Sequence, residues 1–378
     1  MSNRHSLCLI AWVFNMADLQ SIVSSMEERN LINHGMLPAK VNATLKSIRI
    51  CRTKESGMNK DVCDSCGDIR IHYNSCRNPN CPKCQSTERA AWVDRQKYYK
   101  LNISYFHIVF TMPDSLNSLC LHHPKLMYDL LFESVGETLN QLAADKEYLG
   151  ARIGFTTVLH TWGQNLSLHP HLHCIVTSGG ISQSGKWISS KKDFIFPVFV
   201  LSKLFRGKYL SKLKMRLSSE VLEEFKSSIE ESYSKEWVVY VKPPLSNPDK
   251  VIEYLGRYTH RIAISDARII KYEDNRVTFR YKDYKDHNKL KLMTLSEEEF
   301  LRRFIMHIPP KSFMRIRHFG LLSSSYKGKK FETIRKLTNT ELKTTPYVKD
   351  VIRIINSIIK RDVRYCIHCN KLRHPLIE

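Results

Sequence analysis

This sequence of 378 residues has no apolar run of the roughly eighteen residues that a membrane-spanning helix requires, so we expect no membrane partner. It also lacks the GxxxxGK(S/T) loop that cradles nucleotide phosphates, so we expect no ATP motor in the chain. No internal repeat is visible. The length instead suggests two or three domains, and 42% apolar residues are enough to build a core.

Acidic residues are also scarce. The chain has 37 Asp and Glu against 59 Lys and Arg, which gives a net charge of +22. Such an excess favours a polyanionic partner such as nucleic acid, the alternative being a composition that is basic throughout. The N-terminal stretch "RHSLCLIAWVFNMA" has the look of a short signal peptide. We interpret it as a first helix, because export would expose clustered thiols to oxidation, and we expect a cytoplasmic protein.

Those thiols form an unusual set. Of eleven cysteines, five lie within residues 63–84. Cys63-x2-Cys66 and Cys81-x2-Cys84 are two pairs that can complete a tetrahedral, structural Zn²⁺ site, whereas buried small hydrophobic residues would not need this spacing. Cys76 is a fifth thiol that either replaces one of the four or stays outside the site.

A further CxxC lies near the C-terminus. Cys366 and Cys369 supply only two thiols. A second zinc site there needs His368, His374 or a pair of ligands from elsewhere in the fold, and cysteines without metal are the alternative.

The stretch "HTWGQNLSLHPHLHCIVTSGG", residues 160–180, holds four histidines. His171 and His173 would share one face of a strand, whereas Pro170 makes a ladder position less certain for His169. The spacing is compatible with a metal site, with proton transfer or with packing.

Two tyrosines stand four residues apart in "EYLGRYTHR". Tyr254 and Tyr258 would share a helical face with Val251 and Leu255, which is typical of a core stripe. A phenol beside a metal-bound phosphate could instead attack it and form a covalent phosphotyrosine.

Strand and helix patterns mix without regular β-α-β alternation, so we predict an α+β fold rather than a doubly wound sheet. Strands are expected at 103–113, 151–162, 171–180, 262–272, 276–282 and 289–294. Helices are expected before residue 60, after Pro124, within 201–235 and after Asn247, which could cap a helix that begins with Pro248.

The motifs "NSCRNPNCPKCQ", "FHIVFTMPDSLN", "LSLHPHLHCIV", "YLGRYTHRIAIS" and "IRHFGLL" occur in an order that resembles the insertion-sequence-91 family of two-tyrosine HUH transposases. The resemblance covers roughly residues 40–325. It implies a five-stranded antiparallel HUH endonuclease sheet behind an N-terminal zinc-binding domain. It also implies rolling-circle-like transposition, in which single-stranded DNA is nicked at the element ends to leave a 5′-phosphotyrosine.

The resemblance places His171 and His173 on the metal-binding motif and Tyr254 and Tyr258 on the nucleophile pair. It implies Mg²⁺ or Mn²⁺ as the catalytic ion, although two imidazoles on their own would suit a transition metal such as zinc. For the third ligand we favour His169, with His160 and Gln164 as alternatives. Glu253 lies beside the first tyrosine but faces differently on the helix.

We therefore expect four regions: N-terminal helices over 1–60, a zinc ribbon over 61–95, the HUH domain over 96–325 and a basic C-terminal region over 326–378. DNA contacts are expected from seven basic residues: Lys203, Arg206, Lys208, Arg257, Arg261, Arg315 and Arg317. The alternatives to a transposase are a replication initiator or relaxase with the same chemistry, and a zinc-ribbon regulator without catalysis. The cell would be bacterial or archaeal, with the protein acting at the nucleoid, and the oligomeric state stays open.

Overall fold

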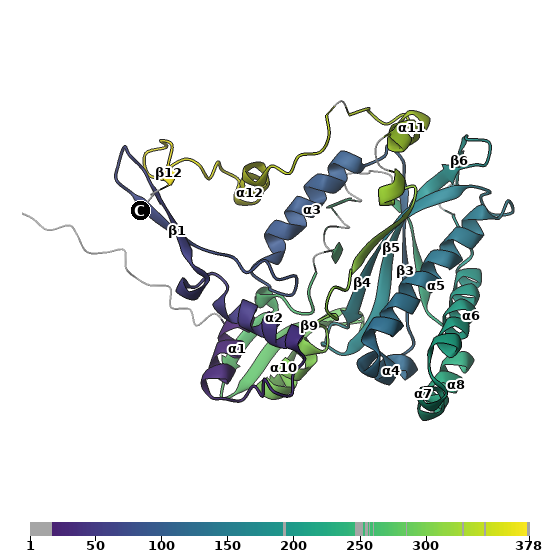
Figure 1. The fold of residues 1–378 in the computed structure, drawn as a ribbon, viewed down its shortest axis with the longest axis horizontal. Coiled ribbons are helices and arrows are strands. Elements are labelled where there is room, and N and C mark those ends of the chain that lie inside the picture. Colours follow the sequence, from purple (N-terminus) through teal and green to yellow (C-terminus); the bar gives the residue numbers. More distant parts are fainter. Residues whose placement is uncertain are drawn as a thin grey trace, which may run out of the picture.

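The computed structural model describes residues 17–191, 194–245, 252–253, 256, 258–259, 261–284, 286–326, 329–343 and 345–375. Helices and three antiparallel sheets are mixed along the chain, which confirms the α+β prediction (Figure 1). Within these ranges, no helix is both long and apolar enough to cross a membrane. The predicted helix start at Asn247 and Pro248 lies outside the described residues.

The largest sheet has the strand order β11-β4-β5-β3-β7, with the short strand β6 paired to β5. Every pairing in it is antiparallel. Its strands are β3 (Tyr105–Thr111), β4 (Arg152–Trp162), β5 (Leu168–Ile181), β6 (Trp187–Ser189), β7 (Val239–Leu245) and β11 (Ile316–Gly320). The family resemblance implied five strands; the sixth arises because β5 is long enough for its end to pair with β6.

The central strands are apolar because both of their faces are covered. β3 reads "YFHIVFT" and β4 is buried along nearly its whole length. Continuous apolar character is what a strand covered on both faces requires. The polar residues within these strands, mainly histidine and threonine, therefore stand out as exceptions to the local pattern.

One face of this sheet is covered by helices, with α5 and α6 lying side by side (Figure 1). The core between them is built from large apolar side chains, among them Phe110, Phe132, Phe155, Leu172 and Phe205. The helices of this layer are α4 (Asn117–His122), α5 (Pro124–Ala144), α6 (Val198–Arg216), α7 (Ser219–Glu224) and α8 (Lys226–Ser234), with a 3-10 turn at Asp114–Leu116.

A second core joins the N-terminal helices to a segment more than two hundred residues away in the sequence. Leu19, Ile22 and Met26 pack with Phe300 and Phe304. The elements of this core are α1 (Leu19–Glu28), α2 (Ala39–Ile50), β8 (Ile269–Glu273), β9 (Arg276–Asp283), β10 (Lys289–Ser296) and α10 (Glu297–Ile305), with a 3-10 turn at Asp266–Arg268. Side-chain caps begin two of these helices, Asp18 for α1 and Ser296 for α10.

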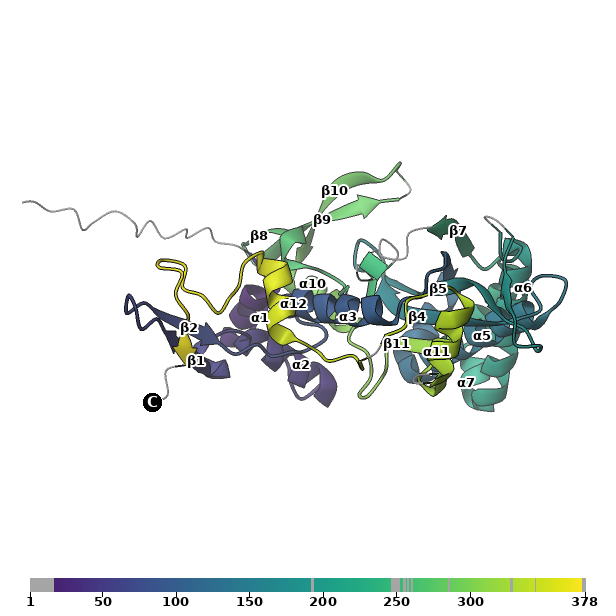
Figure 2. The ribbon, with the colours of Figure 1, turned by 90° about the horizontal axis from the view of Figure 1, so that it is seen from above.

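The remaining elements form an arm beside the two cores. After a 3-10 turn at Lys54–Ser56, β1 (Met58–Val62) pairs with β2 (Ile69–Tyr73) and with β12 (His374–Pro375) from the other end of the chain. Helix α3 (Gln85–Tyr99) runs from this hairpin towards the large sheet, and α12 (Val351–Ile359) lies against it (Figure 2). A 3-10 turn at Ser324–Tyr326 and α11 (Lys329–Leu337) precede α12 in the chain but lie beside the large sheet, where Phe331 and Ile334 of α11 pack with Leu101 and Leu321.

Candidate metal centre and tyrosine segment

Three histidine rings meet on one face of the large sheet. His160 comes from β4, and His171 and His173 come from β5; one ligand nitrogen of each lies within 4.8 Å of the other two. The ring centroids of His160 and His173 are 4.6 Å apart, and those of His171 and His173 are 4.9 Å apart. Three neutral imidazoles arranged in this way can hold one divalent cation and leave coordination positions open.

The strand register explains why these rings converge. His160 lies directly opposite His171, and opposite residues of antiparallel strands place their side chains on the same face. His173 follows two residues later and shares that face. Alternation along one strand therefore supplies two rings, and the neighbouring strand supplies the third.

Each ring has one nitrogen that is already engaged within the protein. His160 Nε2 lies 2.7 Å from the Tyr258 carbonyl oxygen, and His171 Nδ1 lies 2.7 Å from the His169 carbonyl oxygen. His173 Nδ1 lies 2.9 Å from His107 Nε2. Metal-binding histidines commonly use the second nitrogen in this way, because the hydrogen bond fixes the tautomer and leaves the other nitrogen for the ion.

Burial keeps the three rings neutral. It lowers the pKa of His171 to about 4 and lowers the pKa of His160 and of His173 well below the usual value of 6.5. The positive charge of Arg261 lowers all three further. Neutral imidazole is the form that binds a metal ion, and burial favours that form in all three rings at pH 7.

Tyr258 lies against this cluster. Its ring centroid is 4.3 Å from that of His173 and 6.0 Å from that of His160. The described residues between 252 and 259 are helical, as the sequence predicted. Tyr254 and Arg257, the other predicted site residues of this segment, lie outside the described residues.

The third histidine of the cluster is His160 and not His169, which we favoured from the sequence. The pairing of β4 with β5 shifts between His160 and Trp162, so the regular register ends before it reaches His169. His169 takes part through its backbone carbonyl, which orients His171. Register across two strands, which a single strand pattern cannot give, brings the ring of His160 rather than that of His169 beside the pair.

The other two candidates for a third ligand are engaged elsewhere. Gln164 donates from Nε2 to the hydroxyl of Tyr284 at 3.3 Å. Glu253 forms an ion pair with Lys97 at 2.9 Å and is largely exposed. Neither side chain faces the three rings.

His107 is a member of the site that the sequence analysis did not single out. It lies in β3 opposite Ile175, which puts its ring on the same face as His171 and His173. Its ring stacks on that of His173 with centroids 5.1 Å apart, and the centroid of Tyr258 lies at 5.5 Å. A lone polar residue in the apolar run "YFHIVFT" was the available signal.

A pocket adjoins the histidine cluster on the same face of the sheet. Ile175, two residues beyond His173 in β5, forms part of its floor. Helix α3 supplies aromatic and basic side chains to the wall. The lining includes Trp92, Arg95, Tyr99, Lys100, Tyr105 and His318. Such a mixture of flat rings and cations suits the bases and phosphates of a nucleic acid.

The predicted DNA-contacting residues fall into two groups. Arg261 is exposed and close enough to the three histidines to depress their pKa values. Arg315, which also lowers the pKa of His160, is half-buried and donates to the Pro79 carbonyl at 3.2 Å. These two lie on the histidine side of the sheet.

The other four that the structure describes, Arg317, Arg206, Lys208 and Lys203, lie with the helical layer on the opposite side. Arg317 pairs with Asp129 of α5 and lies over the Phe132 ring at 4.0 Å. In α6, Arg206 donates to two backbone carbonyls. Lys208 faces Glu137 at 3.8 Å, and Lys203 lies over the Phe199 ring.

Comparison with known proteins gives two family matches. The family described as "Putative transposase" matches residues 154–330, and the family described as "Transposase zinc-binding domain" matches residues 22–112. A protein of Sinorhizobium fredii named "Putative transposase y4qJ" is 41% identical over 361 residues, which cover 91% of each chain. The chain belongs to the insertion-sequence-91 family of transposases.

A second relative of this transposase is the "Transposase for insertion sequence element IS801" of Pseudomonas savastanoi pv. phaseolicola. It is 30% identical over 324 residues, which cover 82% of this chain and 78% of the relative. No solved structure matches the transposase significantly. The zinc-binding match and two clusters of cysteines together support structural Zn²⁺ in the transposase.

Eight of the cysteines that the structure describes form two clusters of four, in each of which the sulfur atoms lie within 4.8 Å of one another. One contains Cys51, Cys76, Cys81 and Cys84; the other contains Cys63, Cys66, Cys366 and Cys369. From the spacing we expected Cys63 and Cys66 to share one site with Cys81 and Cys84. That prediction was wrong, because the structure places the two pairs in different clusters.

The hairpin between the two CxxC pairs keeps them apart. Cys63 and Cys66 lie in the turn between β1 and β2, whereas the second pair follows the base of that hairpin. Strands of five residues place turn and base roughly 16 Å apart at about 3.3 Å per residue. Cys51, at the end of α2, completes the cluster with Cys76, Cys81 and Cys84, which we call the basal cluster. No CxxC pattern marked Cys51 in the sequence.

Proposed function

We propose that this transposase nicks single-stranded DNA at the ends of its element by tyrosine attack on a phosphodiester. The observation that carries the proposal is the contact between Tyr258 and a cluster of three neutral histidines. The phenol oxygen of the tyrosine would form a bond to phosphorus while the bond to the 3′-oxygen breaks. The phenol proton passes to water and the 3′-oxygen takes up a proton, which leaves a 5′-phosphotyrosine and a free 3′-hydroxyl.

The three histidines suit a divalent cation because each offers one nitrogen and orients the other. Such an ion, Mg²⁺ or Mn²⁺, would polarise the scissile phosphate and neutralise its developing charge. His160 has a second task, since its hydrogen bond to the Tyr258 carbonyl ties the tyrosine segment to the sheet. Arg261 would add a cation to the phosphate path.

The tyrosine pair and the pocket indicate how the strand would be held. Tyr254 lies four residues before Tyr258, so a helix would place it on the same face, where it could accept a second strand. Bases of the single strand would stack in the pocket beside the cluster, on Trp92 or Tyr99. A phosphotyrosine keeps the exchange potential of the bond, so a later 3′-hydroxyl can displace it and transfer the strand.

A structural zinc ion in the basal cysteine cluster completes the proposal. Cys84 Sγ lies 3.6 Å from Cys51 Sγ and 3.6 Å from Cys76 Sγ. Four thiolates fill the positions of a tetrahedral site and leave none for water, so the ion would hold the fold together and take no part in the chemistry.

The test is an adduct assay with labelled single-stranded element ends and Mn²⁺ or Mg²⁺. A protein–DNA band that resists denaturation should form. It should weaken in Tyr254→Phe and in Tyr258→Phe and disappear in the double variant, while Tyr240→Phe, an exposed tyrosine of β7, should leave it unchanged. A full-strength band in the double variant would rule out the tyrosines as nucleophiles, and an equal band on fully duplex ends would rule out single-strand preference.

A further inference from the structure

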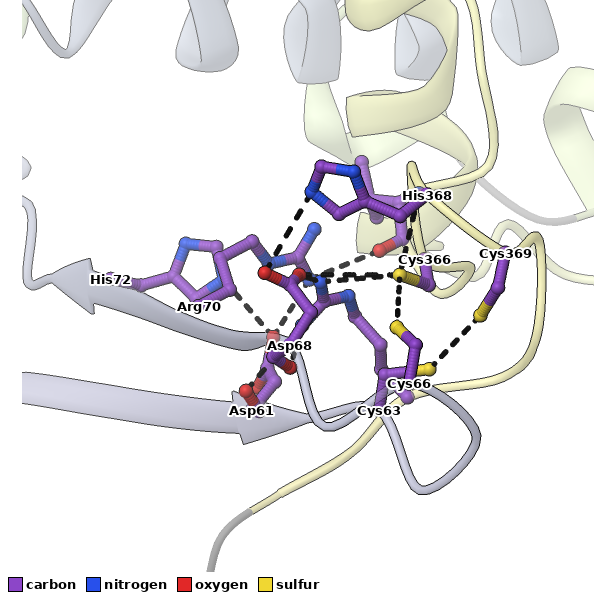
Figure 3. A network of polar contacts seen from close by, with 11 residues as sticks. Asp61, Cys63, Cys66, Asp68, Arg70, His72, Cys366, His368 and Cys369 are labelled. Carbon is purple, nitrogen blue, oxygen red and sulfur yellow. Dashed lines mark hydrogen bonds and ion pairs between the residues drawn. The ribbon is translucent and has the colours of Figure 1, made fainter. Parts of the chain in front are cut away.

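The second cysteine cluster joins opposite ends of the chain. Cys63 and Cys66 lie in the β1–β2 turn, and Cys366 and Cys369 lie in a C-terminal turn three hundred residues later (Figure 3). The match to the zinc-binding family ends at residue 112, so it does not include the C-terminal pair. The cluster also lies on the arm, apart from the histidine site in the large sheet.

The sulfur geometry fits one tetrahedral ion. Cys63 Sγ and Cys369 Sγ are 3.3 Å apart, Cys66 Sγ and Cys366 Sγ are 3.6 Å apart, and all four lie within 4.8 Å. A Zn–S bond of roughly 2.3 Å implies sulfur atoms about 3.8 Å apart on a tetrahedron. These separations exceed the roughly 2.05 Å of a disulfide, and Cys66 is exposed, so neither disulfide bonding nor core packing explains the arrangement.

The two turns have the same backbone hydrogen bonds. The N–H that follows the second cysteine donates to the carbonyl of the first: Gly67 to Cys63 at 2.8 Å, and Asn370 to Cys366 at 3.0 Å. Both Gly67 and Asn370 have positive φ, at 69° and 55°. These residue types adopt that conformation most readily, so each turn is shaped to present two thiols in one direction.

The first cysteine of each turn also donates its N–H across the turn. Cys63 donates to the Asp68 carbonyl at 3.0 Å, and Cys366 donates to the Lys371 carbonyl at 2.8 Å. Two segments with no sequence continuity thus form the same ligand-presenting structure, and they face each other. We infer that Cys63, Cys66, Cys366 and Cys369 bind a second structural Zn²⁺ that fastens the C-terminal segment to the N-terminal hairpin; we call this site the clasp.

Polar contacts around the clasp also hold the C-terminal turn against the β1–β2 hairpin (Figure 3). Arg373, which is buried, pairs with Asp68 and donates to the sulfur of Cys366 at 3.5 Å. Arg70 of β2 donates to the Val363 carbonyl at 3.1 Å, and β12 extends the β1–β2 sheet by pairing with β1. His368, which the sequence offered as a ligand, points towards Asp68 instead.

The clasp has a consequence for the segment that precedes it. Ile354 of α12 is buried, and the side chains of Arg353 and Tyr347 bond to Asp94 of α3 at 2.8 and 3.0 Å. Zinc at the clasp therefore holds residues 345–359 along α3. Without it, the segment would be held by the bonds to Asp94, by Ile354 and by the contacts of Tyr98 with Thr345 and Tyr347, and it should become more accessible to proteases.

Zinc content of the purified full chain tests the site directly, and it is independent of nicking activity. We expect about two zinc ions per chain in the wild type, and about one in Cys366→Ser/Cys369→Ser and in Cys63→Ser/Cys66→Ser. His368→Ala and His374→Ala are matched controls that should keep about two. A C-terminal double variant with the same zinc content as the wild type would overturn the clasp.

Thiol labelling of the wild type covers the case in which a serine variant fails to fold. A maleimide should modify Cys66 and Cys369 slowly in the zinc-loaded chain and at least tenfold faster after chelation, as read by peptide mass spectrometry. Trypsin should then cut within residues 343–360 only in the chelated chain. Equal labelling rates of Cys66 and Cys369 before and after chelation would reject the clasp even if the other cluster holds zinc.

Discussion

At the scale of single residues, the histidines show that strand register, and not spacing in the sequence alone, decides which rings meet. His169, His171 and His173 alternate in the sequence, yet only the last two join the cluster, and His160 completes it from the adjacent strand. The sequence placed the pair correctly on one face. It could not choose the third ring, because that choice depends on the strand register and on the shift beyond His160.

A site built from His160, His171 and His173 predicts a large effect for one alanine variant and almost none for another. His160→Ala would remove the proposed third ligand, so we expect Mn²⁺ to bind at least about 100-fold more weakly, measured by calorimetric titration. His169→Ala is a matched control because it keeps the backbone carbonyl that orients His171 and removes only a ring that packs beside that of His171, and we expect a change of less than about threefold. Equal losses in the two variants would reject His160 as the third ligand.

At the scale of elements, α3 supports the tyrosine segment. A Cβ added to Gly256 would lie 2.4 Å from Cγ2 of Val93 and 3.7 Å from Cγ of Arg89, so the segment approaches α3 as closely as only glycine permits. Lys97 of α3 adds an ion pair to Glu253. The position of Tyr258 beside the histidines therefore depends on a helix that carries no ligand itself.

This close contact predicts a displacement that a second substitution relieves. Gly256→Ala should push the segment from α3 at a cost of about 1–3 kcal/mol, which lowers adduct formation roughly tenfold or more. Val93→Ala in the same chain should restore most of the activity by making room. Zinc content should be unchanged in both, and a double variant no better than Gly256→Ala would contradict this packing explanation.

The partners of the CxxC pairs also depend on how the elements are arranged. Two CxxC pairs predicted zinc, and the pairing between them was inferred from proximity in sequence. The β1–β2 hairpin keeps the pairs apart, so each takes its partners from elsewhere: from α2 for the basal cluster, and from the C-terminal turn for the clasp. Spacing within a pair is a local property, whereas the choice of partner pair is a tertiary one.

At the scale of the whole molecule, the hairpin of β4 and β5 connects the two cores. Its strands line the large core, while Trp162 and Leu166 at its turn enter the second one. His307, just beyond α10, clamps this turn, with Nε2 3.1 Å from the Leu166 carbonyl and Nδ1 3.2 Å from the Thr161 hydroxyl. Burial lowers the pKa of His307 from 6.5 to about 4.

Because the folded pKa is depressed, this residue stabilises the fold fully above pH 6.5, and the contribution disappears as pH falls through 4. The pKa difference corresponds to about 3 kcal/mol at pH 4. We expect urea unfolding to show that His307→Gln is less stable than the wild type at pH 7.5. The difference in free energy of unfolding between the two proteins should shrink by about 3 kcal/mol when the pH is lowered to 4, because only the wild type loses the contribution of His307. His122→Gln, at an exposed position, is the control, and a deficit that stays constant with pH would contradict the prediction.

The sequence by itself determined the local chemistry of this transposase: the α+β class, the histidine pair, the tyrosine spacing, the CxxC turns and the family. These features are set within a few residues by strand and helix periodicity and by turn conformation. Only the tertiary structure decided which groups meet across long loops: His160 with the pair, His107 behind His173, Cys51 with the basal thiols and Cys366 and Cys369 with the hairpin. Such encounters follow from strand register and core packing, to which all of the chain contributes.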